Sequence, residues 1–284
     1  MADEPTPQFL RQELGARLRD LRLAKDLTVG QVAEELLCSP SKISRMENGQ
    51  RGASPRDVRD LCDVYGVAEP AEREELMALA HGGRQRRAEQ HDFRLVDPKY
   101  NELEATADKI TVCVCSVLPA LFQTEPYRRA HLPGRYPQFD AEEIEVGVEA
   151  VAARQAILTR KDPPDVLAFI DEAALHREVG GAPVMRDQLD RLDRVATLPN
   201  VELRVIPFSV GAHVAADTSF VTLEFYESAV PALVFTESLT VNTQVNRTAD
   251  VKRFTAAITV LRSTALDARG TRSLISAVRD RYAG

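Results

Sequence analysis

Hydrophobic and polar positions along the first 80 residues recur with the period of amphipathic helices. Four leucines that stand about one helical turn apart predict a first helix over 8–25 with one buried face. They are Leu10, Leu14, Leu18 and Leu21. Shorter apolar stripes follow up to about residue 80. The pattern therefore predicts a bundle of short helices at the N-terminus.

Start and stop signals divide this segment further. Thr28 is followed three residues later by Gln31, which is the pattern of a capping box. Ser39–Pro40 and Ser54–Pro55 each combine an N-cap serine with a proline suited to the first helical position. Asn48–Gly49 suits a left-handed helix end. Together the signals predict five helices in about 80 residues.

From about residue 109 the pattern changes to short apolar runs that are typical of strands. These runs are 110–117, 166–170, 201–208, 220–226 and 232–236. Helical patterns alternate with them at 140–158, 185–195 and 251–261. We therefore expect an α+β, mixed fold: a five-helix N-terminal domain over 1–80, a polar linker over 81–95, and a larger mixed α/β domain over 96–284.

Charge is divided unevenly along these domains. Between Arg11 and Arg59 there are ten Lys or Arg against seven Asp or Glu, and since the whole chain carries −7, the rest carries −10. An acidic chain with a locally basic N-terminus fits a specific DNA contact better than a protein that coats nucleic acid. No apolar run approaches the roughly 18 residues of a membrane span, and the first residues lack a signal-peptide pattern, so we expect a cytoplasmic protein.

The segment 27–49 predicts a helix-turn-helix motif that binds DNA. Ile43 and Met46 share one face of its second helix and are expected in the core, which leaves the polar face outward. On that face, a first-turn serine can reach base edges and an arginine can make the bidentate contact to guanine. The candidate DNA contacts are Thr28, Ser39, Ser41, Lys42, Ser44, Arg45, Asn48 and Arg51. Among them, Lys42, Asn48 and Arg51 suit phosphates. The alternative is a helical bundle whose polar face is only solvated.

Five landmarks of this segment resemble the Xre family of bacterial and phage helix-turn-helix regulators. They are Leu27–Thr28, Val32–Ala33, Ser39, Ile43–Ser44–Arg45 and Glu47–Asn48–Gly49. The resemblance covers about 70 residues and implies that the third helix reads DNA, that Glu47 has a structural or phosphate-orienting role, and that a dimer binds a near-palindromic operator. Val29 departs from the family, which commonly has a phosphate-binding glutamine at that position.

The second half resembles the C-terminal domain of actinobacterial developmental regulators of the WhiJ type. The resemblance is carried by the runs 118–125, 151–155, 171–173, 179–181, 199–201 with 206–208, and 211–213. It implies a role in differentiation or antibiotic production, often beside a small partner protein encoded nearby. Loop residues and strand ends supply the candidate ligand or partner contacts, namely Gln123, Thr124, Asp171, Glu172 and His213. A small-molecule pocket and a protein-contact surface both fit them.

No enzyme motif is present in the sequence. It lacks a phosphate-binding loop, a zinc-binding His-Glu-x-x-His helix and a nucleophile elbow, and its five histidines show no metal-ligand spacing. His213 and Asp217 allow a base and its orienter, but a loop histidine held by local hydrogen bonds explains the pattern as well. We expect no enzymatic activity, no cofactor and no metal.

The sequence as a whole predicts a transcriptional regulator, with repression as one mode. It would bind double-stranded operator DNA as a homodimer, associate with the nucleoid when bound, avoid membranes, and receive a signal from an unknown small molecule or a small cognate protein through its C-terminal domain. The alternative is an antitoxin-like protein that holds a small partner and regulates its own operon. Neither the operator nor the sign of regulation follows from the sequence.

Overall fold

The computed structural model describes residues 7–83, 98–226, 228–237, 242–245 and 247–282, and it confirms the predicted α+β fold class. The chain forms two compact units. Unit 1 comprises Met1–Thr106 together with Phe225–Pro231, and unit 2 comprises Ala107–Glu224 and Ala232–Gly284. The units divide at Thr106, ten residues beyond the predicted domain start at 96. Most of the predicted linker 81–95 lies outside the described residues.

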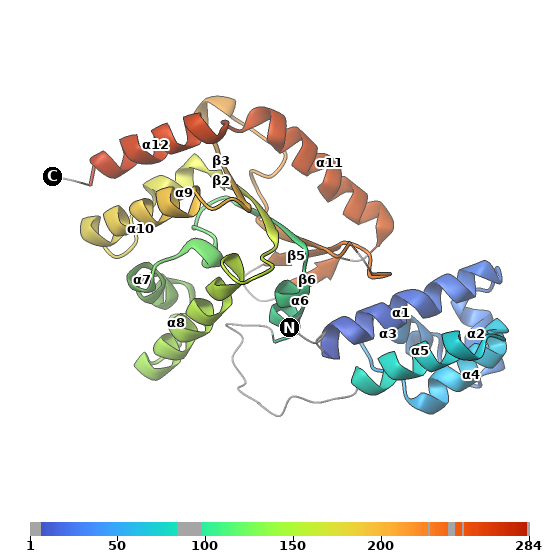
Figure 1. Cartoon of the computed structure of the whole chain (residues 1–284). Helices are drawn as coiled ribbons and strands as arrows, with labels where there is room; N and C mark the ends of the chain where they lie inside the picture. The colour runs from blue at the N-terminus through green and yellow to red at the C-terminus, as the bar shows by residue number, and fades with distance from the viewer. Residues whose placement is uncertain (1–6, 84–97, 227, 238–241, 246, 283–284) are drawn as a thin grey trace. The chain divides into compact units, whose positions relative to one another are not determined.

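Unit 1 is helical, and each of the five predicted N-terminal helices forms (Figure 1). Its helices are α1 Pro7–Ala24, α2 Val29–Glu35, α3 Pro40–Glu47, α4 Pro55–Tyr65, α5 Pro70–Gly82 and α6 Pro98–Thr106. Their core contains Leu14, Leu18, Ile43, Leu61 and Leu76, each at most 3% exposed. Of the predicted leucine stripe of α1, Leu14 and Leu18 lie in this core and Leu21 packs against it, whereas Leu10 is half-buried and lies outside the cluster.

Residues distant in sequence complete unit 1. The buried carboxylate of Glu13 on α1 accepts hydrogen bonds from Ala229 N at 3.3 and 3.0 Å. The rings of Phe9 and Phe225 lie 5.4 Å apart. Unit 1 is thus built from two separate stretches of chain.

Unit 2 contains a six-stranded sheet in the order β3-β2-β1-β4-β5-β6. The strands are β1 Lys109–Val114, β2 Asp165–Asp171, β3 Val201–Ile206, β4 Phe220–Glu224, β5 Leu233–Glu237 and β6 Asn242–Val245. β1, β2 and β3 are parallel, and β4, β5 and β6 continue the sheet in antiparallel pairs. The parallel part follows from helical crossovers between β1, β2 and β3.

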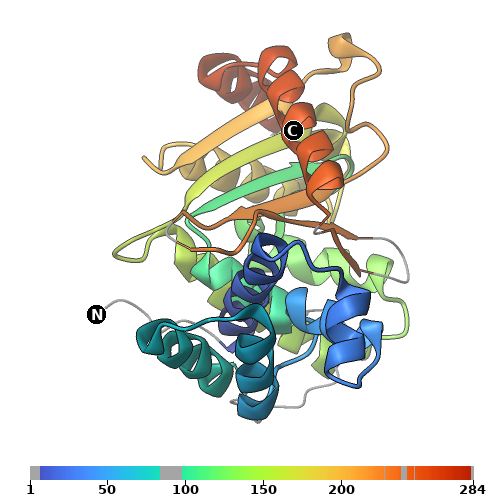
Figure 2. The same cartoon turned by 90° about the vertical axis from the view of Figure 1, so that its right-hand side faces the viewer.

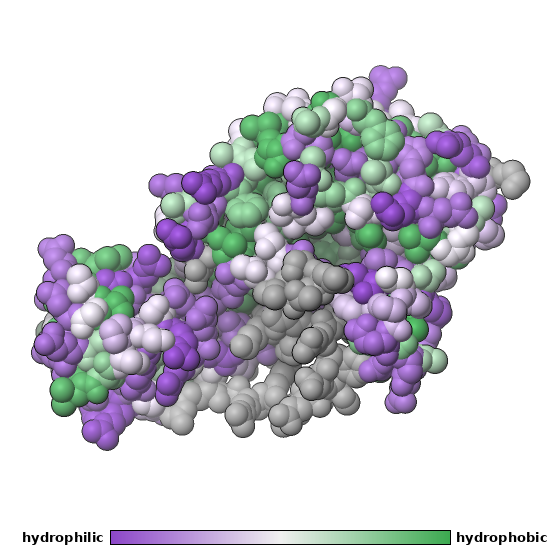
Figure 3. Space-filling model, turned by 180° about the vertical axis from the view of Figure 1, so that it is seen from behind, coloured by the Kyte–Doolittle hydropathy of each residue, from purple (hydrophilic) through white to green (hydrophobic). Residues whose placement is uncertain are grey.

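Helices cover both faces of this sheet. They are α7 Glu125–Arg135, α8 Ala141–Gln155, α9 Glu172–His176, α10 Ala182–Val195, α11 Thr248–Thr264 and α12 Ala268–Asp280. Figure 2 looks onto the face that α11 crosses, where Phe254 packs edge-on against Phe220 with the ring centroids 5.0 Å apart. α7, α8 and α10 lie on the opposite face (Figure 1). In the rear view, hydrophobic residues are interspersed with hydrophilic ones over unit 2 (Figure 3).

Candidate functional site

Two capped helices form the helix-turn-helix of unit 1. Thr28 Oγ1 accepts a hydrogen bond from Gln31 N (3.2 Å) and Gln31 Oε1 accepts one from Thr28 N (2.8 Å), so the predicted capping box begins α2. Ser39 Oγ accepts from Lys42 N (3.2 Å), and Pro40 occupies the first position of α3. The two caps fix where both helices begin.

The turn between these helices holds a leucine in an unusual backbone conformation. Leu37 has a φ of 49° and is 95% exposed. The following residue, Cys38, donates its N–H to Ala33 O at 2.8 Å and closes the end of α2. A left-handed backbone costs an ordinary residue about 1–2 kcal/mol, which glycine avoids. The strain is therefore in the backbone of one residue whose side chain is exposed.

The inward face of α3 anchors the helix in the core. Ile43 and Met46 are buried, as predicted, with 1% and 3% of their surfaces exposed. Glu47 is buried too, and its carboxylate accepts hydrogen bonds from Arg22 Nε (2.7 Å) and Nη2 (2.9 Å). Arg22 Nη1 also donates to Leu27 O at 2.7 Å. Of the two roles that the resemblance implied for Glu47, this buried pair supports the structural one.

Backbone contact between α1 and α3 orients this helix. A Cβ on Gly15 would lie 2.6 Å from the carbonyl oxygens of both Met46 and Glu47. Gly49, just beyond α3, has a φ of 63°, and a Cβ there would lie 2.8 Å from the side chain of Gln12. Because α1 occupies the inward side so closely, the opposite face of α3 is turned away from the core.

Polar side chains line that outward face, as predicted. Arg45 is exposed, and among the described residues its guanidinium donates only within its own helix, to Ser41 Oγ (2.9 Å) and Ser41 O (3.3 Å). Ser44 is half-buried, and its Oγ accepts a hydrogen bond from Asn48 Nδ2 at 3.5 Å. An exposed helix of this length fits the major groove of B-DNA.

Lys42 differs from its neighbours because it has an acidic partner. Its Nζ lies 2.5 Å from Asp57 Oδ1 on α4. Burial alone would raise the pKa of Asp57, but hydrogen bonds from Lys42 and Ser54 lower that pKa to about 2. Lys42 must therefore leave an ionised carboxylate before it can bind a DNA phosphate.

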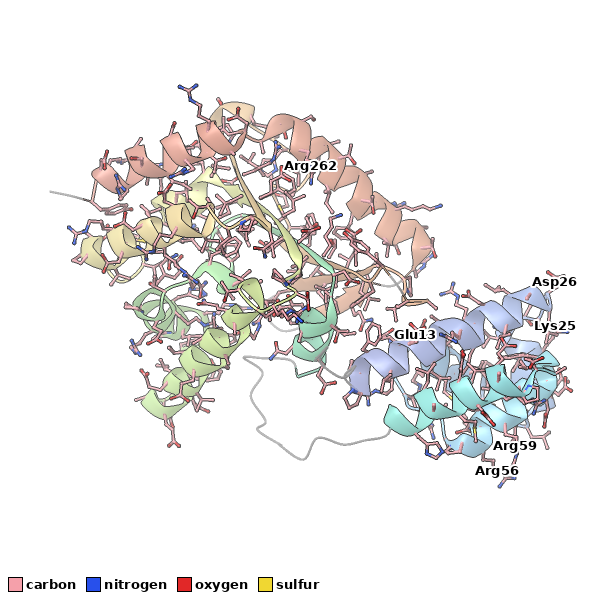
Figure 4. The ribbon with its side chains drawn as sticks, viewed as in Figure 1. Glu13, Lys25, Asp26, Arg56, Arg59 and Arg262 are labelled. Carbon is pink, nitrogen blue, oxygen red and sulfur yellow. The ribbon has the colours of Figure 1, made fainter. Side chains whose placement is uncertain are left out.

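The remaining predicted DNA contacts lie around α3. Thr28 and Ser39 are exposed but serve as N-caps, and Asn48 ends the helix. Arg51 is exposed in the segment that follows. The two arginines of α4, Arg56 and Arg59, are also exposed and reach outward from the same unit (Figure 4). DNA contact by each of these residues stays a prediction.

Part of the predicted cluster in unit 2 forms at the end of β2. Asp171 Oδ2 lies 2.9 Å from His213 Nε2, and its Oδ1 accepts from Ala173 N (2.8 Å) to cap α9. The side chain of His213 is 4% exposed. The partner of His213 is therefore Asp171, and not the neighbouring Asp217 that the sequence suggested.

Glu172 joins the same corner but holds other segments. Its Oε2 accepts from Phe208 N (2.7 Å), and its Oε1 lies 3.2 Å from His176 Nε2. Its side chain is 14% exposed. Glu172 therefore links α9 through a hydrogen bond to the segment that follows β3.

A cysteine lies near this pair without the features of a nucleophile. Cys115 Sγ donates to Ala215 O at 2.9 Å, and burial raises the pKa of its thiol. Burial also raises the pKa of Cys113 to about 12. Among the residues that the structure describes, no three His, Cys, Asp or Glu side chains are placed to hold a metal ion.

The other predicted contacts, Gln123 and Thr124, take part in hydrogen bonds that hold the backbone after β1. Gln123 Nε2 donates to Leu118 O (2.7 Å), and Gln188 Oε1 accepts from Thr124 N (2.7 Å). Gln155 Nε2 donates to Gln123 O (2.7 Å). Three glutamine side chains thus hold this segment, although Gln123 Oε1 is buried without a partner.

Two arginines with unusual surroundings escaped the sequence interpretation. Arg22 of α1 is buried against Glu47, whereas arginine side chains are ordinarily exposed. Arg128 on α7 is buried as well. The sequence feature that could have indicated the burial of Arg128 is its position one helical turn before Leu132, which places both side chains on one helix face.

Two family models match the chain. A family described as a helix-turn-helix domain matches residues 13–76, which confirms the predicted motif. A family described as a domain of unknown function (DUF5753) matches residues 98–277, more than half of the chain. Neither a curated protein nor a solved structure matches. In the described parts of the chain, no helix is both long and apolar enough to cross a bilayer.

Proposed function

Because the chain belongs to the DUF5753 family and carries a helix-turn-helix domain ahead of that match, we propose that it is a sequence-specific transcriptional regulator. The observation that carries the proposal is the outward face of α3. Arg45 and Ser41 are exposed there, while Ile43 and Met46 hold the opposite face in the core. This arrangement supports insertion of α3 into the major groove.

In this proposal, Arg45 reads a base and Lys42 contributes charge. To reach the O6 and N7 atoms of a guanine, the guanidinium of Arg45 gives up its hydrogen bonds to Ser41 and no other hydrogen bond with the described residues. Lys42 exchanges Asp57 for a phosphate oxygen, so its net contribution is reduced by the ion pair that it gives up. Ser39 and Ser41 lie on the first turn and complete the base contacts.

We further propose that two copies bind an inverted repeat and that unit 2 receives a signal without catalysing a reaction. A ligand or small protein that binds one dimer arrangement better than another would change operator affinity by that difference in binding free energy. The resemblance to Xre-family and WhiJ-type regulators supports control of differentiation or secondary metabolism in an actinobacterium.

The test begins with selection of genomic DNA fragments by the purified full chain, followed by affinity titrations on the enriched sequence. Arg45→Ala should weaken binding by about 1–3 kcal/mol and relax selectivity at one base pair. Lys42→Ala should weaken binding to all sequences and reduce the slope of log Kd against log salt by about one unit. Arg186→Ala, on an exposed side chain of unit 2, serves as the control and should bind as the original chain does.

An unchanged affinity and selectivity of Arg45→Ala would show that α3 does not read DNA as proposed. Failure to enrich any sequence, combined with recovery of one stoichiometric small protein from the native host, would favour the antitoxin-like alternative.

A further inference from the structure

Helix α7 contains a buried arginine whose charge has no partner. Arg128 is 9% exposed, and its Nε is buried without a hydrogen-bond acceptor. Within the described residues, its guanidinium forms no ion pair and no hydrogen bond. The next residue, Arg129, is different: it is exposed and binds Glu145 through two nitrogens, at 2.6 and 2.8 Å. Because a buried charge is normally compensated, the missing counterion at Arg128 needs an explanation.

The surroundings of Arg128 are positively charged. Burial lowers its pKa to about 10, and the nearby Arg154 of α8 lowers the pKa further in the same direction, so the group stays a cation at neutral pH. Arg135 also lies in this corner of unit 2, where it binds Glu237 at 3.0 Å. Glu237 is the one carboxylate that acts on Arg128 electrostatically among the described residues. The carboxylate nearest in effect to Arg128 is therefore already bound by Arg135.

The histidine beside Arg128 does not compensate its positive charge. Burial, together with Arg128 and Arg135, lowers the pKa of His131 to about 4, so its imidazole is neutral at neutral pH. A neutral imidazole has one N–H donor and one acceptor nitrogen. The corner therefore offers hydrogen-bond donors beside the unpaired cation of Arg128, and it is made by α7 and α8, which pack together on one side of the sheet (Figure 1).

We propose that Arg128, with Arg154 beside it, binds the oxyanion of a small molecule, a carboxylate or a phosphate group. The planar guanidinium presents paired N–H donors that match two oxygens of either group. The bound anion supplies the missing counterion and the acceptor for the orphaned Nε–H. A small anion fits better than an acidic protein surface because Arg128 is about nine-tenths buried.

The experiment is thermal unfolding of the full chain without DNA, so that its outcome is independent of the proposed regulatory function. Inorganic phosphate and succinate are titrated separately, with sodium chloride added to keep the ionic strength constant. At about ten times its Kd, the correct anion should raise the unfolding midpoint of the original chain by about 3–6 °C. The difference between the two titrations identifies a phosphate or a carboxylate as the ligand group.

Two matched substitutions locate the effect. Arg128→Met should abolish the anion-dependent rise, whereas Arg129→Met, the same change at the exposed neighbour, should keep it. In buffer without phosphate or succinate, Arg128→Met should be at least as stable as the original chain because it removes an uncompensated buried charge. Arg128→Lys keeps the positive charge but loses the paired N–H donors of the guanidinium, so it should retain only part of the anion-dependent rise in the unfolding midpoint. This variant also serves as the test if Arg128→Met does not fold.

Three results would overturn the proposal. The first is no rise with either anion in the original chain. The second is a rise that Arg128→Met and Arg128→Lys retain in full, which would place the anion elsewhere. The third is binding of polyglutamate, but not of the small anions, in a manner that depends on Arg128, which would indicate an acidic macromolecular partner.

Discussion

Leu37 has a strained, left-handed backbone conformation, unlike the residues on either side of it. With a φ of 49° and 95% exposure, it has little packing to offset a left-handed conformation. Leu37→Gly should therefore raise the unfolding free energy of the chain by about 1 kcal/mol in urea denaturation. The gain is limited because glycine also has more conformational freedom in the unfolded state.

Leu37→Ala separates strain from side-chain loss. Alanine keeps the Cβ that causes the strain, so the Leu37→Ala variant should have the same unfolding free energy as the original chain. A loss of stability in Leu37→Gly would contradict the strain argument and show that the leucine side chain contributes contacts of its own.

Charged residues illustrate what could be predicted at this scale. The outward position of Arg45 follows from its spacing to Ile43 and Met46, which is a local property of a helix. The pairing of Asp171 with His213 joins residues 42 positions apart, and no local pattern encodes it. The burial of Arg128 was missed because no helix is predicted over Glu125–Arg135 and because arginine is ordinarily exposed.

At the scale of elements, the approach of α1 to α3 depends on one glycine. Gly15→Ala would place its Cβ 2.6 Å from two backbone carbonyl oxygens, which cannot move as a side chain can. The substitution should lower the unfolding free energy by about 1–3 kcal/mol and should also weaken operator binding, because α3 is displaced. Urea denaturation and DNA titration of the full chain measure the two effects.

Gly30 provides the matched control, since it lies inside α2 and the nearest atom to a Cβ there is 3.8 Å away. Gly30→Ala should stabilise the chain by about 0.5–1 kcal/mol because alanine is the better helix former. If Gly15→Ala were equally stabilising, the close approach of α1 and α3 would not be rigid.

The elements were predictable where their signals are local. Ser39, Ser54 and Asp140 each cap a helix where the sequence indicated a start. Strand β6 escaped prediction because Asn242–Val245 has four residues and two polar interior positions, so it forms through pairing with β5. Helix α6 was missed because Pro98–Thr106 has almost no amphipathic pattern.

At the scale of the whole molecule, the proposed dimer makes a geometric prediction. Two α3 helices in successive major grooves read half-sites about 34 Å apart, which is one turn of B-DNA. Insertion of about five base pairs between the half-sites turns one of them to the opposite side of the duplex. Affinity should fall toward that of a single half-site, as measured by titration of the full chain.

A spacer of unchanged length but altered sequence is the control, and it should bind nearly as well as the original operator. Insertion of a full turn, about ten base pairs, should restore the facing of the half-sites and part of the affinity. Equal binding to all three spacings would show that the copies bind independently.

The discontinuity of unit 1 affects the time at which this unit is completed during synthesis. The five predicted N-terminal helices leave the ribosome early, but Phe225–Pro231 belongs to the same unit and supplies the amide that meets Glu13. At about 5–20 residues per second, that segment is made roughly 6–25 s after Thr106. During this interval the newly made helices carry Glu13 without the amide of Ala229 and Phe9 without the ring of Phe225.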